Sequence, residues 1–133
     1  MKKDNPFPSV LIELPDDVIT KGEGTVVSYW RTDDMCLLQI SSRLRSKGQQ
    51  VSAAERLSDR QKEGNWQLFQ LPREIKGCDT AAASTTDDKG NTWVYIYLVW
   101  EWLAVLVTVT REGGIEPCNW VWVAISTIRP VLM

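Results

Sequence analysis

The chain has 133 residues, of which 44% are hydrophobic and 24% are charged, and its formal net charge is −2. This composition is that of one globular domain of ordinary size, and it excludes disordered, collagen-like and low-complexity proteins. The small negative charge argues against binding to nucleic acid or to an anionic membrane through a general positive field. The sequence contains no histidine, so triad hydrolases and imidazole-ligated zinc enzymes are excluded as well.

The first part of the chain predicts a short lead-in followed by strands. Pro6 and Pro8 interrupt regular structure, so residues 1–9 are expected to be a loose N-terminal segment before a single domain over residues 10–133. Apolar runs bounded by Asp, Gly and Pro then predict three strands, at residues 10–14, 25–31 and 35–43.

A helix is predicted to begin at Ser52. Ser52 and Glu55 have the spacing of a capping box, in which a hydroxyl and a carboxylate each accept a hydrogen bond from a free backbone N–H. Gly64 is a suitable end for this helix. Its apolar face is narrow, so we expect the helix to lie on the surface.

The second half of the chain predicts more strands and a closing helix. Residues 66–71 and 80–86 are expected strands, and the Asp87–Asn91 stretch is typical of a hairpin turn. The last apolar run, residues 118–128, fits helical spacing and also alternates like a strand. We favour the helix, because a proline stands near each end of the run.

The longest apolar stretch is WVYIYLVWEWLAVLVTVT, from Trp93 to Thr110. Its length suits a membrane span, but Glu101 stands at its centre and its β-branched and aromatic residues favour strands. We therefore predict a hairpin with its turn at 100–103. Since both faces of this hairpin are apolar, we expect an α+β fold with a central antiparallel sheet flanked by helices on both faces. A small β-barrel with one or two helices is the alternative.

This order of elements resembles the PsbP-like fold. The resemblance rests on the strand VLIELPDDV, the capped helix SAAERLSDRQKEGNW, the strand WQLFQLPREIKG, the hairpin around KGNTWVYIYLVW and the closing helix NWVWVAISTIRP. It covers residues 10–131 as a pattern of elements and carries no catalytic motif. The fold is shared by photosystem subunits, a nuclear-transport factor and bacterial families, among which are cytosolic chaperones for secreted toxic effectors. The resemblance therefore implies a three-layer sandwich and a non-enzymatic role.

The cysteines and paired aspartates do not predict a metal or a cofactor. Cys36, Cys78 and Cys118 are odd in number and far apart, so we expect buried thiols in place of a zinc site or a disulfide framework. No apolar leader follows the N-terminal lysines, and together these features predict a cytoplasmic protein. The three Asp-Asp pairs fall in turns, where aspartate is common for its local hydrogen bonding.

Tryptophan is the residue that points to a function, because the chain has seven. Tryptophan and tyrosine dominate protein-binding hot spots. We therefore predict a partner-binding site that comprises the hairpin tip, an acidic turn and one helix residue, namely Trp100, Glu101, Trp102, Asp33, Asp34 and Trp122.

The function predicted from the sequence is non-enzymatic binding of another protein. A bacterial immunity protein that neutralises a cognate toxin fits best, since acidic segments complement a basic toxin. A cytosolic chaperone for a secreted effector and a small-ligand-binding barrel are the alternatives, and self-association into a homodimer remains open.

Overall fold

The computed structural model describes residues 1–44, 52–61, 66–75, 77–116 and 118–131. Within this part of the chain there are ten strands and two helices. In chain order they are β1 (Lys2–Phe7), β2 (Val10–Leu14), β3 (Ile19–Glu23), β4 (Val26–Trp30), β5 (Leu37–Leu44), α1 (Ala53–Gln61), β6 (Gln67–Leu68), β7 (Asp79–Thr86), β8 (Asn91–Val99), β9 (Leu103–Glu112), α2 (Asn119–Ser126) and β10 (Arg129–Pro130). Neither helix is long and apolar enough to cross a membrane.

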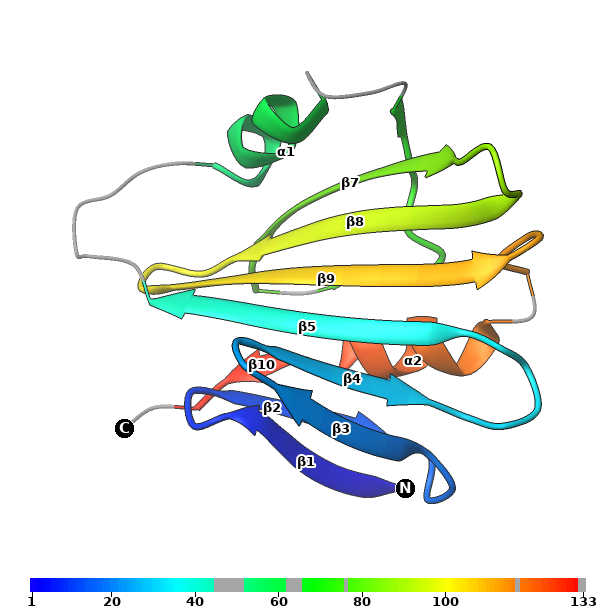
Figure 1. The fold of residues 1–133 in the computed structure, drawn as a ribbon. Coiled ribbons are helices and arrows are strands. Elements are labelled where there is room, and N and C mark those ends of the chain that lie inside the picture. The colour runs from blue at the N-terminus through cyan, green and yellow to red at the C-terminus, as the bar shows by residue number, and fades with distance from the viewer. Residues whose placement is uncertain (45–51, 62–65, 76, 117, 132–133) are drawn as a thin grey trace.

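The strands form two antiparallel sheets. The large sheet has seven strands in the order β3-β4-β5-β9-β8-β7-β6, and the small sheet has three in the order β1-β2-β10. Figure 1 shows the large sheet nearly face-on, with the small sheet beside β3 and β4. The predicted hairpin at residues 92–111 is confirmed as β8 and β9, which pair along their whole length at the centre of the large sheet.

Successive side chains of β8 and β9 point to opposite faces of the large sheet. We call the face of Ile96, Leu98 and Val107 the inner face, because these side chains are fully buried. Side chains of β2 and α2 pack against the inner face and form one core with it. The closing helix predicted at residues 118–128 is confirmed as α2, and the strand alternative for this segment is wrong.

The opposite, outer face of the large sheet carries helix α1 at one end. Ala53 packs there with Val99 and Ala104, and α1 contacts β7 and β8. Ser52 caps α1 as predicted, since its Oγ accepts a hydrogen bond from the Glu55 N–H at 3.1 Å. The predicted end of this helix, Gly64, lies outside the described residues.

The predicted fold class is therefore wrong. The described chain is mostly strand, and the layer over the inner face is a second sheet together with α2, so a helix-flanked three-layer sandwich is not formed. A closed barrel is not formed either, because β3 and β6 are two separate ends of the large sheet. The physical reason is that Trp93, Tyr95 and Tyr97 cover the outer face of the hairpin while remaining partly exposed.

The N-terminal residues also differ from expectation. Residues 2–7 form β1, which pairs with β2 and places Asp4 opposite Ile12. Pro6 is tolerated because β1 is an edge strand. The Oη of Tyr29, buried in β4, donates a hydrogen bond to Asp4 Oδ2 at 2.6 Å and so links the two sheets.

The two end strands of the large sheet are short or charged. All five residues of β3 are exposed, with Lys21 and Glu23 among them, and β6 has two residues.

Candidate functional site

The outer face of the large sheet presents rows of side chains that follow the pairing register. One row runs across five strands with mainly polar groups, namely Lys21, Ser28, Gln39, Thr108 and Tyr95. The next row runs parallel to it, namely Glu23, Val26, Ser41, Leu106 and Tyr97. Most of these side chains on β4, β5, β8 and β9 are half-buried, so the outer face is a mixed polar and aromatic surface.

Two hollows lie on this face. The first has a volume of about 270 Å³, and we call it the Arg56 hollow; its lining residues are Thr25, Ser41, Ser42, Arg56, Tyr97, Ala104, Val105 and Leu106. The second has a volume of about 330 Å³ and is lined by Glu23, Val26, Ser28, Gln39, Ser41 and Thr108. Ser41 lines both, so the two hollows adjoin. The amide of Gln39 donates to Ser28 Oγ at 3.2 Å in the floor of the second.

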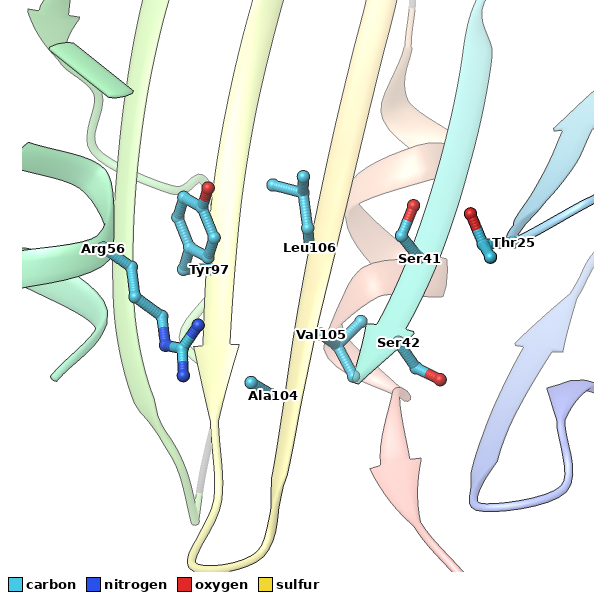
Figure 2. Close-up of a pocket in the computed structure, with 8 residues that line it drawn as sticks. All are labelled: Thr25, Ser41, Ser42, Arg56, Tyr97, Ala104, Val105 and Leu106. Atoms are coloured by element: carbon cyan, nitrogen blue, oxygen red, sulfur yellow. The ribbon is translucent and has the colours of Figure 1, made fainter. Parts of the chain in front are cut away.

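Helix α1 places a positive charge over the Arg56 hollow. The N–H of Arg56 bonds the Ser52 carbonyl, and the N–H of Ala53 donates to Asp79 Oδ2 of β7 at 2.8 Å, so the first turn of α1 is attached to the sheet. Figure 2 shows the side chain of Arg56 reaching from α1 toward Tyr97 and Ala104, with Leu106 beyond them. The position of the Arg56 side chain therefore depends on the capped start of α1.

The Nε of Arg56 is fully buried and has no hydrogen-bond partner. A buried donor that is left unpaired costs about 1–3 kcal/mol, and more when the group is charged. Thr110 Oγ1, on the same face of β9, is the second such atom among the described side chains. Of these two atoms, only the Nε of Arg56 belongs to a residue that lines one of the two hollows.

The chemistry of the outer face favours binding. A guanidinium is always charged and donates in a planar fork that matches carboxylate and phosphate groups. Glu23 is the single carboxylate among the described side chains that line the two hollows, so these side chains provide no acid–base pair of carboxylates. No cluster of metal ligands occurs among the described residues.

A third hollow lies beside β7. It has a volume of about 670 Å³ and is lined mainly by residues 68–75 and 78–82. Phe69 in its wall stacks on Trp122, with ring centroids 5.5 Å apart. Cys78 is half-buried and lies 3.4 Å from the hydroxyl of Thr80, and burial raises the pKa of its thiol. A raised pKa keeps the thiol protonated and unreactive near neutral pH.

The predicted partner site is not assembled as expected. The turn at Trp100-Glu101-Trp102 is present, with the Trp100 N–H bonded to the Leu103 carbonyl at 2.8 Å. Glu101 is exposed, but both rings are half-buried against the inner core. Trp122 is 7% exposed in α2 and belongs to the core, so its prediction as a surface anchor is wrong.

The acidic turn lies far from the hairpin tip. Leu37, just after this turn, pairs with Thr110, whereas the tip adjoins Leu103 at the other end of β9, a separation of roughly 24 Å along the strand. Asp34 has a structural role, since its Oδ2 accepts a hydrogen bond from the Trp120 indole at 2.6 Å. Asp33 is exposed and lies 3.6 Å from Arg31. Asp33 and Asp34 therefore do not form one surface with the tip.

The prediction that all three cysteines are thiols is also wrong. Cys36 and Cys118 form a disulfide that joins the loop before β5 to the start of α2. An odd number of cysteines does not exclude one disulfide, because a single free cysteine, here Cys78, can remain. Sequence spacing carries no information on this pair, because 82 residues separate its members.

The Arg56 hollow is not among the sites predicted from the sequence. A usable signal was present in residues 37–41, where buried Leu38 and Ile40 alternate with Gln39 and Ser41. This alternation indicates a strand with one polar face. On β9, Thr108 is likewise a polar residue between two buried valines. The place of Arg56 over that face depends on how α1 docks, which no local pattern encodes.

Comparisons with known proteins add a fold relationship. No protein-family model matches the chain, and no curated protein sequence matches it. A chain from Bacteroides thetaiotaomicron VPI-5482, solved at 1.50 Å, is similar in structure, with a TM-score of 0.64 and 12% sequence identity. The match covers 92% of this chain and 45% of that chain, so this chain spans less than half the length of its neighbour. At this identity the likeness concerns the fold alone, and it does not test the PsbP-like resemblance.

Proposed function

We propose that this protein is a non-enzymatic binding domain that holds a small molecule on the outer face of its large sheet. One observation carries the proposal: the buried Nε of Arg56 has no partner and lies at a hollow of about 270 Å³ beside Tyr97. Ligand sites are typically concave, mostly apolar and equipped with a few polar groups that fix orientation. Tyr97, Ala104 and Leu106 supply the apolar lining here, and Arg56 with the hydroxyl groups supplies the polar part.

The dimensions of the site support the same reading. Ligand pockets usually span about 300–1,000 Å³, so the Arg56 hollow by itself suits a small molecule or one end of a larger one. The adjoining second hollow extends the site across β4 and β5. Both floors belong to paired strands, so the site exists before the ligand arrives and little ordering entropy opposes binding.

A fragment screen followed by amide NMR tests this proposal. We expect bound fragments to shift the amide signals of Ser41, Tyr97 and Leu106, which line the hollow on three adjacent strands. Arg56→Ala should weaken the binding of those fragments that contact the guanidinium. Arg129→Ala is the matched control, because this exposed arginine lies in the small sheet and pairs with Glu13 at 3.5 Å. Fragments that shift signals only elsewhere would refute the assignment of the site.

A protein partner, as predicted from the sequence, is the second candidate function. The turns with Asp17, Asp33 and Asp88 all lie at the end of the large sheet where β9 finishes. Met35 is 69% exposed at this end and has a φ of 62°, which is an unusual backbone state for a residue other than glycine. A basic partner such as a cationic toxin is complementary to this acidic end.

Binding kinetics with the protein encoded by the adjacent gene test the second candidate. Replacing Asp33 and Asp88 by Asn should slow association at low salt and reduce its salt dependence. Unchanged association kinetics, or no complex at all, would remove the immunity role.

The disulfide supports a site of action different from the predicted cytoplasm. Disulfides persist mainly in oxidising compartments. We therefore extend the proposal to a protein that works in an oxidising compartment. Thiol titration of protein taken directly from its host measures this: two protected cysteines support it, and three free thiols oppose it.

A further inference from the structure

The Arg56 hollow also indicates the class of ligand. We propose that it binds a carboxylic acid, with the carboxylate against the guanidinium of Arg56 and an apolar body over Leu106. This inference rests on the proposed function, since it names the ligand of the same site. It depends on three features of the hollow, which are its charge, its hydroxyl groups and its apolar floor.

Arg56 is the one cation among the described side chains that line the hollow. Among the described residues, no carboxylate forms an ion pair with Arg56, and no group bonds its buried Nε. Glu55 in α1 is exposed, and Asp79 Oδ2 already accepts the Ala53 N–H. An arginine in such surroundings gains most from an oxyanion, because a charge-assisted hydrogen bond is about twice as strong as a neutral one.

The hydroxyl groups stand across the hollow from the charge. Figure 2 shows Ser41 and Thr25 on the side of β5 and β4, with Leu106 between them and the Arg56–Tyr97 side. Hydroxyl groups donate and accept hydrogen bonds, so they bind a polar substituent at the far end of a ligand without demanding a charge. The two polar sides are therefore chemically different, and they give the ligand a direction.

The apolar floor favours a carboxylate over a phosphate. Leu106, Ala104 and the ring of Tyr97 lie beside Arg56, and no second cation is present among the described side chains that line the hollow. A phosphate monoester carries nearly two negative charges near neutral pH, and one guanidinium leaves one of them uncompensated beside apolar groups. A carboxylate carries one charge, and its two oxygens can accept two parallel N–H hydrogen bonds from one guanidinium.

Three aromatic probes of one size test the inference: benzoate, benzamide and phenyl phosphate. Each is titrated into the full chain while the amide signals of Ser41, Tyr97 and Leu106 are followed. We expect benzoate to bind at least tenfold more tightly than benzamide and more tightly than phenyl phosphate. Arg56→Ala should weaken benzoate binding at least tenfold and leave benzamide binding within about twofold, whereas Arg129→Ala should change neither.

The outcomes separate this inference from the proposed function. Equal binding of benzoate and benzamide in the hollow, unaffected by Arg56→Ala, would overturn the carboxylate class while the small-molecule site stands. Tighter binding of phenyl phosphate would also overturn it, in favour of a phosphate ligand. Absence of any probe or fragment at these three amides would refute both. Arg56→Gln, which keeps the length and polarity of the side chain, replaces Arg56→Ala if that variant fails to fold.

Discussion

The inner and outer faces of the large sheet are built from the same strands, yet only the inner face is part of a core. The inner-face residues in the middle of β8 and β9, such as Ile96 and Val107, are fully buried under β2 and α2, while Tyr95, Tyr97 and Leu106 on the outer face remain partly accessible. The inner face uses Val, Ile and Leu almost throughout. The outer face combines aromatic rings with Ser, Thr and Gln. Such a mixed face tolerates both exposure to solvent and burial. The comparison teaches that apolar content alone does not decide which face is covered; the kind of apolar side chain matters too.

The largest effect on the free energy of unfolding is expected from the disulfide that attaches α2, which packs on the inner face, to the large sheet. The Cys36–Cys118 bond joins α2 to the loop before β5, and cross-links of this span stabilise a chain by about 4 kcal/mol in the loop-entropy model. The double variant Cys36→Ala/Cys118→Ala should lose most of that free energy of unfolding in urea. Cys78→Ala, the control, should lose under about 1 kcal/mol, because Cys78 is half-buried and unbridged. Equal stability of the double variant and the wild type would show that packing alone holds α2.

Two leucines compare the faces directly. Leu98 on the inner face is fully buried, and Leu106 on the outer face is half-buried, on adjacent strands of the same hairpin. Leu98→Ala should reduce the free energy of unfolding by about 3 kcal/mol, as for other core leucines. Leu106→Ala should reduce the free energy of unfolding by about 1 kcal/mol, because the half-buried side chain of Leu106 buries less apolar area. Chemical denaturation measures both, and equal losses would mean that the outer face is covered after all.

The smallest effect concerns the link between the two sheets. Burial, and then the hydrogen bond to Asp4, raise the pKa of Tyr29 well above its usual value of about 10. The neutral phenol therefore contributes stability that is complete below about pH 10 and is lost as the pH rises above it, when the unfolded chain ionises. Tyr29→Phe should cost about 1 kcal/mol at pH 7 and reduce the loss of stability between pH 9 and 11.

A control for this prediction lies on the outer face. Tyr95→Phe is a matched change, since Tyr95 lies on the outer face and its replacement leaves the Tyr29–Asp4 hydrogen bond in place. Urea denaturation of both variants at several pH values gives the comparison. A wild-type decline that persists in Tyr29→Phe would place the responsible group elsewhere.

Local features of the fold were predictable from the sequence. The hairpin of β8 and β9 followed from β-branched and aromatic residues on either side of a turn, and the start of α1 followed from Ser52 and Glu55. These signals act within a few residues of one another, so no knowledge of the rest of the chain is needed. The polar alternation at Gln39 and Ser41 belongs to the same kind, and it was overlooked.

The features that depend on long-range packing were not predictable. Cys36 meets Cys118, and Arg56 meets Tyr97, only because distant elements dock side by side. The tip at Trp100 and Trp102 shows the reverse error, since residues of a solvent-exposed turn were assumed to keep their rings exposed. The rings instead fold back onto the inner core, and only Glu101 between them remains exposed. The structure therefore does not bring the predicted site residues together on one surface, and the Arg56 hollow could be found only in three dimensions.

The charged edge strand has a consequence for the behaviour of the protein at high concentration. An open sheet edge offers free N–H and C=O groups to any other strand, which is the first step of aggregation. On β3, the charged residues Lys21 and Glu23 flank Gly22. A strand that paired with β3 would place its side chains beside these charges and would bury little apolar surface. The other edge, β6, offers only two residues for pairing. The large sheet is thus poorly suited to grow by addition of further copies, although both of its ends are open.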